Sequence, residues 1–300
     1  MANNLTLEDI DNLYLWYTRL EGNELGSKEE ILDIYYITAK NSIPKEVFKL
    51  NSLEGLEIEV EDLTEIPKEI GNLSNLNRLE IRGCHNLKEL PKEIGNLTNL
   101  GGWNNKFGSG GLSIIDCPNL EELPKEIGNL SNNLNHLTIE GCHNLKELPK
   151  EIGNLTNLYS LYIKKCHNLT ELPKEIGNLN NLNSLTIESC LNLKELPKEI
   201  GNLSNLNDDL YIEIKGCHNL TELPKEIGNL NNLNRLTIED CLNIKELPKE
   251  YWNKDMKEQE VKIKIENGDN IELLKSTLDS AISNSANKSL ELTIELKNLD

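Results

Sequence analysis

Cysteine and histidine stand side by side several times in this chain. The tetrapeptide Cys-His-Asn-Leu begins at Cys84, Cys142, Cys166 and Cys217. Thiolates and imidazoles are ligands that zinc prefers, so the repeated pair raises the hypothesis of a zinc site. Such a site needs four ligands that converge on one point, whereas neighbouring residues in a turn point in different directions. We therefore expect no metal site.

The seven cysteines occupy one regular position of the sequence. Each stands six residues before a Leu-Pro pair, and their number is odd. A secreted disulfide framework has irregular spacing and an even count, whereas one small buried thiol at a repeated position suits a reducing compartment. We expect free thiols at Cys84, Cys117, Cys142, Cys166, Cys190, Cys217 and Cys241.

No other pattern forms a recognisable reaction centre. The segment 108–111, Gly-Ser-Gly-Gly, lacks the lysine and the following helix of a phosphate-binding P-loop. No nucleophile, base and orienting group can be assembled from the sequence. We expect no catalytic residue, no cofactor and no enzymatic activity.

The cysteines and histidines stand at fixed positions of a longer repeat. A Leu-Pro-Lys-Glu or Ile-Pro-Lys-Glu start recurs nine times, usually about 24 residues apart, and a period of this length is typical of a solenoid. The starts are Ile43, Ile66, Leu90, Leu123, Leu148, Leu172, Leu196, Leu223 and Leu247.

The unit 182–203 indicates how each repeat folds. Leu185 and Ile187 alternate with polar residues, which predicts a short strand with one buried face. Pro197 is expected at the first position of a helical turn, and Gly201 in the left-handed conformation that ends it. Each coil is predicted to hold one strand and one short helical return.

This unit, L-x-x-L-x-I-x-x-C-x-N-L followed by L-P-K-E-I-G-N-L, resembles the leucine-rich repeat family over residues from about Ile43 to Trp252. It is similar to repeats of intracellular plant immune receptors, Ras-pathway scaffolds and bacterial proteins. The resemblance implies an α/β solenoid that is curved, with a parallel β-sheet on its concave face and short helical turns or irregular segments on its convex face. It also implies that the cysteine, in place of the usual asparagine, points inward and bonds weakly to neighbouring backbone.

Three regions are predicted: a helical N-terminal cap over 1–42, the solenoid over 43–252, and a β-α-β cap over 253–300. In the first region, Thr6 and Asp9 form a helix-capping box. The helix after it is expected to pack through Leu7, Ile10, Leu13, Leu15 and Tyr17, and to end at Gly22 and Gly26.

Two further segments of the caps carry specific expectations. Ser27 and Glu30 match a second capping box, although the run Ile34–Thr38 is equally consistent with a first strand. In the last region, alternation over 261–265 and 290–296 predicts two strands, and apolar spacing over 271–282 predicts a helix between them.

One repeat is interrupted by a glycine-rich insertion, 101–111. It holds Trp103 and Phe107, and the chain has only two phenylalanines. Large rings in a loop are candidate contact residues. The alternative is that both rings fold back over the edge of the coil.

The outward residues of the predicted strands form three columns. The column after the repeated Ile alternates in charge, and opposite charges on strands about 4.8 Å apart stabilise the sheet, so we interpret it as structural. The other two columns vary in kind and include residue types that anchor interfaces. The alternative is a face left unspecialised after recent duplication. The candidate partner-binding residues are Arg78, Trp103, Phe107, His136, Tyr162, Tyr211 and Arg235.

A net charge of −19 argues against nucleic acid and anionic membranes as partners, because both attract basic proteins. The pattern of a secretory signal or a membrane span is absent, which predicts a cytoplasmic protein, with export by a non-classical route left open. The function predicted is a non-enzymatic scaffold that binds a protein or peptide on the concave face. The alternatives are a structural or surface repeat protein without a ligand, and an adaptor or effector that recruits an enzyme through its terminal caps. The oligomeric state is left open.

Overall fold

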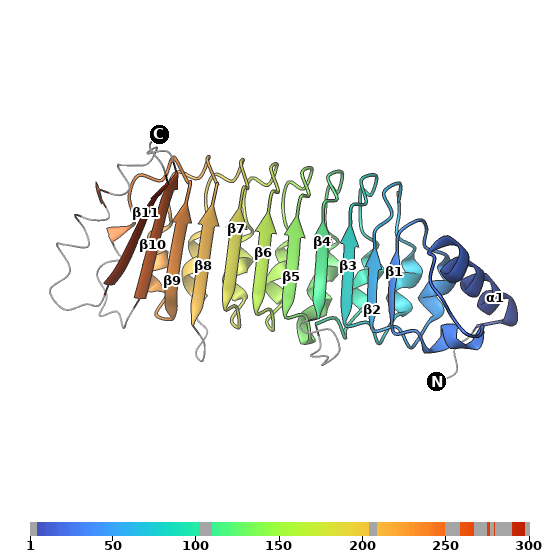
Figure 1. Cartoon of the computed structure of the whole chain (residues 1–300). Helices are drawn as coiled ribbons and strands as arrows, with labels where there is room; N and C mark the ends of the chain where they lie inside the picture. The colour runs from blue at the N-terminus through green and yellow to red at the C-terminus, as the bar shows by residue number, and fades with distance from the viewer. Residues whose placement is uncertain are drawn as a thin grey trace.

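The computed structural model describes residues 5–101, 110–203, 209–249, 259–266, 275–276, 279 and 290–297. Within these ranges, eleven strands form one parallel sheet in which every strand pairs with the next in sequence (Figure 1). The chain therefore winds in one direction, one strand per coil. The strands are β1 Tyr36–Ala39, β2 Gly55–Ile58, β3 Arg78–Arg82, β4 Gly111–Ile115, β5 His136–Glu140, β6 Ser160–Lys164, β7 Ser184–Glu188, β8 Leu210–Lys215, β9 Leu233–Glu239, β10 Gln259–Glu266 and β11 Leu290–Lys297.

The register of the strands follows the repeat. In β7 the side chains of Leu185 and Ile187 are fully buried, and they pair with Leu161 and Ile163 of β6. Equivalent residues therefore stack in columns along the sheet, and the prediction of a short strand with one buried face is confirmed. Each column of Leu or Ile forms part of one continuous core, because no coil can bury its apolar face alone.

The returning half of each coil is a short 3₁₀ helix on the side opposite the sheet (Figure 1). Such short runs are usual for 3₁₀ geometry. The solenoid fold, with its parallel sheet and short helical turns, is thereby confirmed. The 3₁₀ helices of the array are η3 Lys45–Lys49, η4 Lys68–Asn72, η5 Lys92–Asn96, η6 Lys125–Asn132, η7 Lys150–Asn154, η8 Lys174–Asn178, η9 Lys198–Asn202 and η10 Lys225–Asn229.

Two details predicted for the returning half are wrong. Pro197 is the extended residue before the helix, and its carbonyl accepts the amide of Ile200 at 3.0 Å. Gly201 lies inside η9 and does not have a positive φ. A Cβ at this position would overlap the carbonyl oxygen of Glu226 in the next coil. The repeated glycine is thus required by the close approach of two backbones.

The left-handed residue lies elsewhere, immediately before each cysteine. Its φ is 53° at Ser189 and 67° at Gly141, for example. This conformation turns the chain out of the strand, and it costs a residue with a Cβ about 1 kcal/mol. The full set is Gly83, Asp116, Gly141, Lys165, Ser189, Gly216 and Asp240.

The cysteines point into the core, as the resemblance implied. All seven are buried and free. The thiol of Cys190 donates to the carbonyl of Ile163 in the preceding coil, with 3.8 Å between sulfur and oxygen. Burial raises the pKa of the Cys166 thiol to about 12, so this sulfur stays protonated at neutral pH.

The N-terminal cap begins with α1, Leu7–Leu15, and the capping box is confirmed. The hydroxyl of Thr6 accepts the amide of Asp9, and the carboxylate of Asp9 accepts the amide of Thr6. The helix continues into a π-helical turn, η1 Trp16–Leu20, and the chain leaves it through Gly22 at a φ of 72°. Leu13 is buried, but Leu7 is 82% exposed, so its expected place in the packed face is wrong.

The predicted second capping box at Ser27 is wrong. The carboxylate of Glu30 accepts the amide of Gly26, and the short 3₁₀ helix η2, Glu29–Asp33, has no side-chain cap. The alternative, a first strand within Ile34–Thr38, is correct in type: β1 pairs with β2 in the main sheet. The β-branched and aromatic run therefore extends the sheet into the region predicted as a cap.

At the other end, β10 and β11 are parallel and continue the sheet, so the two predicted strands are confirmed. The helix predicted over 271–282 lies largely outside the described residues. No helix in the described part of the chain combines the length and apolar character needed to cross a bilayer.

Candidate interaction surface

The outward side chains of β1–β9 form what we call the sheet face. Pairing places Thr138 beside Tyr162 and Tyr162 beside Thr186, and it places Ser184 beside Tyr211 and Tyr211 beside Arg235. The columns predicted from the sequence are therefore the columns of the structure. In the two columns other than the one after the repeated Ile, the residues vary from coil to coil, so this face has no simple repeat.

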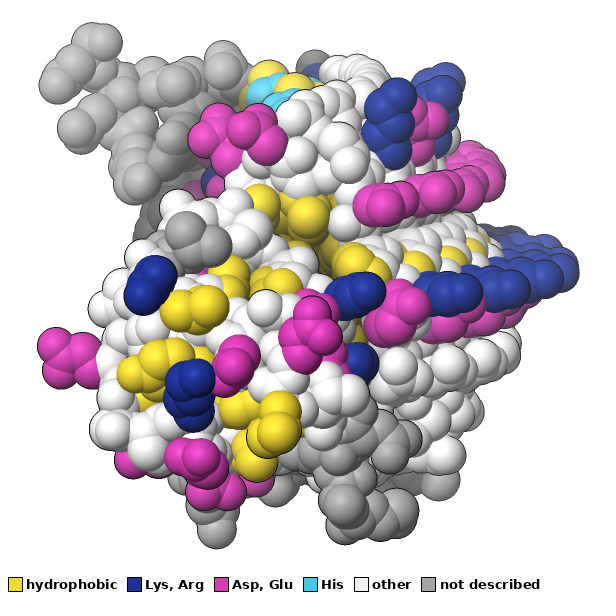
Figure 2. All heavy atoms as spheres, turned by 90° about the vertical axis from the view of Figure 1, so that its right-hand side faces the viewer, with side chains coloured by type: hydrophobic (Ala, Val, Ile, Leu, Met, Phe, Trp, Pro, Cys, Tyr) yellow, Lys and Arg dark blue, Asp and Glu magenta, His cyan; other side chains and the backbone are white. Residues whose placement is uncertain are grey.

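The opposite side of the molecule is regular. Each 3₁₀ helix of the array begins with an exposed lysine, such as Lys92, Lys125 and Lys150. Figure 2 looks along the solenoid from its N-terminal end and shows charged side chains in long rows. A surface on which every coil presents the same residues offers no particular position to a partner. The sheet face is therefore the better candidate for specific recognition.

His136 on β5 lies beside an aromatic residue that the sequence analysis missed. Its ring centroid is 6.3 Å from that of Tyr159, which is 41% exposed. His136 Nδ1 is 2.8 Å from Oδ1 of Asn135, and burial lowers the pKa of this half-buried histidine. The signal for Tyr159 was present: it stands directly before β6, where the coils on either side carry Asn135 and Asn183.

Tyr211 and Arg235 are neighbours across β8 and β9. The guanidinium of Arg235 lies 5.8 Å from the centroid of the Tyr211 ring, within the range of a cation–π interaction. The Tyr211 hydroxyl is 3.4 Å from the carboxylate of Asp209. On β6, the amine of Lys164 is 5.9 Å from the Tyr162 ring. These contacts hold both tyrosines on the sheet face.

Arg78 is separate from this group. It belongs to β3, where its guanidinium donates to Glu80 at 3.0 Å, and Arg82 donates to the other oxygen of the same carboxylate at 2.8 Å. Glu80 is 6% exposed. Arg78 is thus committed to an internal ion pair, and β4 lies between it and His136. Trp103 and Phe107 lie outside the described residues.

The column after the repeated Ile, which we call the third column, contains ion pairs between strands. The amine of Lys164 is 3.3 Å from the carboxylate of Glu188 on the next strand, and the amine of Lys215 is 4.0 Å from that of Glu239 on the next strand. Lys215 also lies 3.1 Å from Glu213, a residue of its own strand in the middle column. The alternating charges therefore contact one another, in agreement with their structural interpretation.

The histidines that follow the cysteines lie in the turns after the strands. The rings of His143 and His167 stack at 4.4 Å between centroids and are nearly parallel, while His85 lies 3.5 Å from Glu61. In the ranges that the structure describes, no three His, Cys, Asp or Glu side chains gather in a metal-binding arrangement. The cysteine and histidine of each pair are directed differently, as the turn geometry requires.

The chain is similar to known repeat proteins. Residues 112–208 match the family model of the leucine-rich repeat region. The leucine-rich repeat domain of the type III effector XopL aligns over 81% of this chain and 84% of its own length, with 24% identity and a TM-score of 0.60. Identity at this level shows the fold alone.

Two other structures align at lower TM-scores. A Leptospira interrogans LRR protein covers 86% of this chain and 81% of its own, with 24% identity and a TM-score of 0.30. The Arabidopsis receptor kinase HAESA, solved with the peptide hormone IDA and the co-receptor SERK1, covers 87% of this chain and 40% of its own, with 20% identity and a TM-score of 0.43. No curated protein sequence matches the chain. Residues 112–208 thus match the leucine-rich repeat model, and the chain has the same solenoid fold as the leucine-rich repeat domain of XopL with which it aligns.

Proposed function

We propose that this protein is a non-enzymatic scaffold that binds a protein or peptide on the sheet face between β5 and β9. One observation carries the proposal: five residues from four coils lie on or beside one face, namely His136, Tyr159, Tyr162, Tyr211 and Arg235. Tyrosine and arginine are the residue types in which binding energy at interfaces concentrates.

The geometry of this surface suits an extended partner. Strands in a sheet lie about 4.8 Å apart, so a segment crossing from β5 to β9 spans four such steps and contacts several coils in turn. The tyrosine rings supply apolar area with few rotatable bonds, and their hydroxyls, with that of the partly exposed Thr138, supply hydrogen bonds. We place this activity in the cytoplasm, because one unoxidised thiol per coil suits a reducing compartment.

The experiment compares binding by the wild type and by a Tyr162→Ala/Tyr211→Ala variant to the partner captured from native lysate. We expect a loss of at least about tenfold in affinity, since each truncation removes an anchor. Tyr14→Ala is the matched control, because Tyr14 lies on α1, away from the sheet face. Circular dichroism verifies that all variants are folded. An unchanged affinity of the double variant, or an equal loss in the control, would remove the sheet face as the binding surface.

A further inference from the structure

One ring nitrogen of His136 is fixed as a hydrogen-bond acceptor on the sheet face. The other nitrogen, Nδ1, is 2.8 Å from Oδ1 of Asn135. An amide oxygen can only accept, so Nδ1 carries the proton and donates it to Asn135. In neutral imidazole the second nitrogen then has a lone pair and no proton. The contact with Asn135 therefore selects the tautomer in which Nε2 is the acceptor.

The neighbouring coil holds Asn135 in place. Its backbone carbonyl accepts the amide of Tyr159 at 2.8 Å and the amide of Ser160 at 2.9 Å. The ring of Tyr159 in turn lies 6.3 Å from the ring of His136. The imidazole is thus positioned by its neighbours before any partner arrives, which lowers the entropy that binding must remove.

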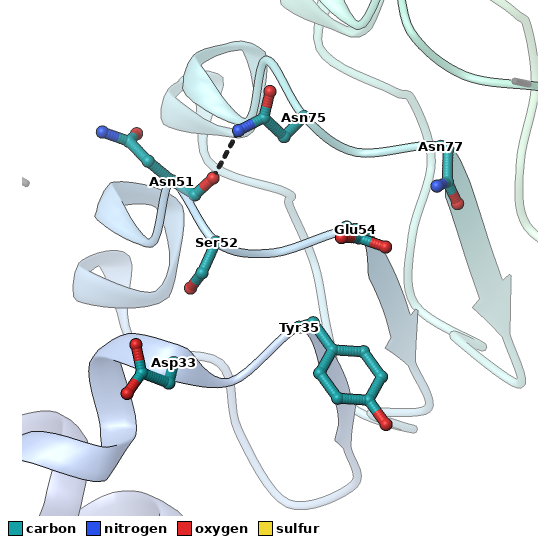
Figure 3. Close-up of a pocket in the computed structure, with 7 residues that line it drawn as sticks. All are labelled: Asp33, Tyr35, Asn51, Ser52, Glu54, Asn75 and Asn77. Atoms are coloured by element: carbon teal, nitrogen blue, oxygen red, sulfur yellow. Dashed lines mark hydrogen bonds between the residues drawn. The ribbon is translucent and has the colours of Figure 1, made fainter. Parts of the chain in front are cut away.

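The Nε2 atom of His136 is accessible to solvent. Within the described ranges, one buried side-chain nitrogen or oxygen has no hydrogen-bond partner, and this atom is Oδ1 of Asn77. Asn77 lines a polar cavity of about 440 Å³ at the N-terminal end of the solenoid, together with Asp33 and Glu54 (Figure 3). Nε2 of His136 also forms no hydrogen bond with any described residue, but it is not buried. A donor of a partner can therefore reach it.

The strands around His136 place no charge beside its ring. Strand β4 contains no charged residue, and the outward charged residues of β5 and β6 are Glu140 and Lys164. Both lie four residues further along the sheet, about 13 Å away. The titratable group in ring contact is the phenol of Tyr159. Burial lowers the pKa of His136 below its ordinary value of 6.5, so the ring is neutral at pH 7.

We propose that Nε2 of His136 accepts a hydrogen bond from the partner on the sheet face, so that the partner binds more tightly at neutral pH than in acid. The donor is an N–H or O–H group that lies beside the Tyr159 ring. A protonated imidazole has two N–H groups and no lone pair, so it cannot accept this bond. The inference rests on the proposed function, because it names the chemistry by which the same face recognises its partner.

The first experiment observes the ring nitrogens of His136 by NMR in the full chain. The probe is a peptide without histidine or acidic residues, selected at pH 7 from a displayed library of random linear peptides, whose binding is lost in Tyr162→Ala/Tyr211→Ala. We expect a proton on Nδ1 in the free protein, and a lower pKa of His136 with the peptide bound, because the donor stabilises the neutral ring. A proton on Nε2, or a pKa that the peptide leaves unchanged or raises, would overturn the proposal.

The second experiment measures the affinity for this peptide as a function of pH. The wild-type affinity should fall by up to about tenfold for each pH unit below the pKa of His136 in the free protein. His136→Gln retains an acceptor oxygen but does not titrate, so its affinity should not change with pH. The control His143→Gln removes a histidine from the turn after β5 and should keep the wild-type profile. A wild-type profile in His136→Gln would contradict the proposal.

Asn135 is a positioning residue, and its replacement tests the tautomer. Asn135→Asp places a carboxylate beside Nδ1, which should raise the pKa of His136 and move the loss of affinity to higher pH. An unchanged profile would overturn the assigned contact.

The tyrosine variant separates this inference from the proposed function. If the tyrosines are required for peptide binding while His136→Gln keeps the wild-type pH dependence, the sheet face binds the peptide without His136, and only this inference fails. If no selected peptide depends on Tyr162 and Tyr211, the proposed function fails and this inference fails with it.

Discussion

The returning half of a coil and its strand differ sharply in how much they vary. The segments 149–153, 173–177 and 197–201 all read Pro-Lys-Glu-Ile-Gly, whereas the middle outward positions of β6, β7 and β8 hold Tyr162, Thr186 and Glu213. In the returning half, the glycine of one coil meets the backbone of the next. On the sheet face, the outward side chains lie outside the core and range from buried, as in Thr186, to partly exposed, as in Tyr162 and Glu213. Contact with the neighbouring coil, rather than function, therefore accounts for the invariant half.

The strongest test of this difference is Gly177→Ala. The added Cβ would overlap the carbonyl oxygen of Glu199 and lie 2.9 Å from its carbonyl carbon, so two coils must separate. We expect a loss of about 3 kcal/mol in the free energy of unfolding, measured by urea denaturation. Gly83→Ala is the control, since its Cβ would meet nothing within 4 Å and only its φ of 63° is unfavourable. Equal losses in the two variants would refute the packing explanation.

Glu80 is a sheet-face residue that we expect to stabilise the fold, and this expectation can be tested. Burial raises the pKa of this carboxyl, but hydrogen bonds from Arg82 and Arg78 outweigh burial and hold the pKa below its ordinary value of 4.5. Its contribution to stability is therefore complete above about pH 4.5 and is lost as the pH falls through the folded-state pKa.

For Glu80→Gln we expect a loss of about 1.5 kcal/mol at pH 7, because the two arginines lose their charged acceptor. The loss should shrink as the pH falls through the lowered pKa of Glu80, because the wild-type carboxyl then also becomes protonated. Urea denaturation at pH 7 and at a series of acidic pH values measures this change. A difference in the free energy of unfolding between the wild type and Glu80→Gln that is the same at every pH would contradict the ion-pair explanation.

Ser189→Gly should stabilise the protein. Ser189 has a φ of 53°, a conformation that glycine adopts without strain, as Gly141 and Gly216 do at the equivalent position. The expected gain is about 1 kcal/mol in the free energy of unfolding. Thr186→Gly, inside β7, the strand that ends just before Ser189, is the control and should destabilise. A loss at Ser189 would show that its side chain contributes more than its backbone costs.

The smallest effect is expected for the ion pair between Lys164 and Glu188. Its partners are 3.3 Å apart and about one-third exposed. A double-mutant cycle with Lys164→Ala and Glu188→Ala should give a coupling of about 0.5 kcal/mol. The same cycle in 1 M salt should give less, because salt screens exposed charges. A coupling that is large and independent of salt would show that the third column does more than stabilise neighbouring strands.

Much of the fold could be predicted from the sequence because the repeat is long and regular. Leu185 and Ile187 recur at fixed spacing, which predicted the strand and its buried face, whereas the inward direction of the cysteine was implied by the resemblance to leucine-rich repeats. The roles of Pro197 and Gly201 were mistaken, because the sequence does not show that the next coil approaches the glycine. For the candidate surface, the columns followed from the repeat, whereas Tyr159 was missed because it lies one residue before its strand.

The sequence by itself determined the solenoid, its strand register and the list of residues that vary along the sheet. Periodicity suffices for this, because each coil must bury the same face against its neighbours. Only the tertiary structure decided which of the varying residues are already engaged. Arg78 is tied to Glu80, whereas His136 lies beside an exposed tyrosine. It also decided that Asp33, Glu54 and Asn77 line one cavity, because stacking brings residues about one coil apart in sequence to neighbouring positions in space.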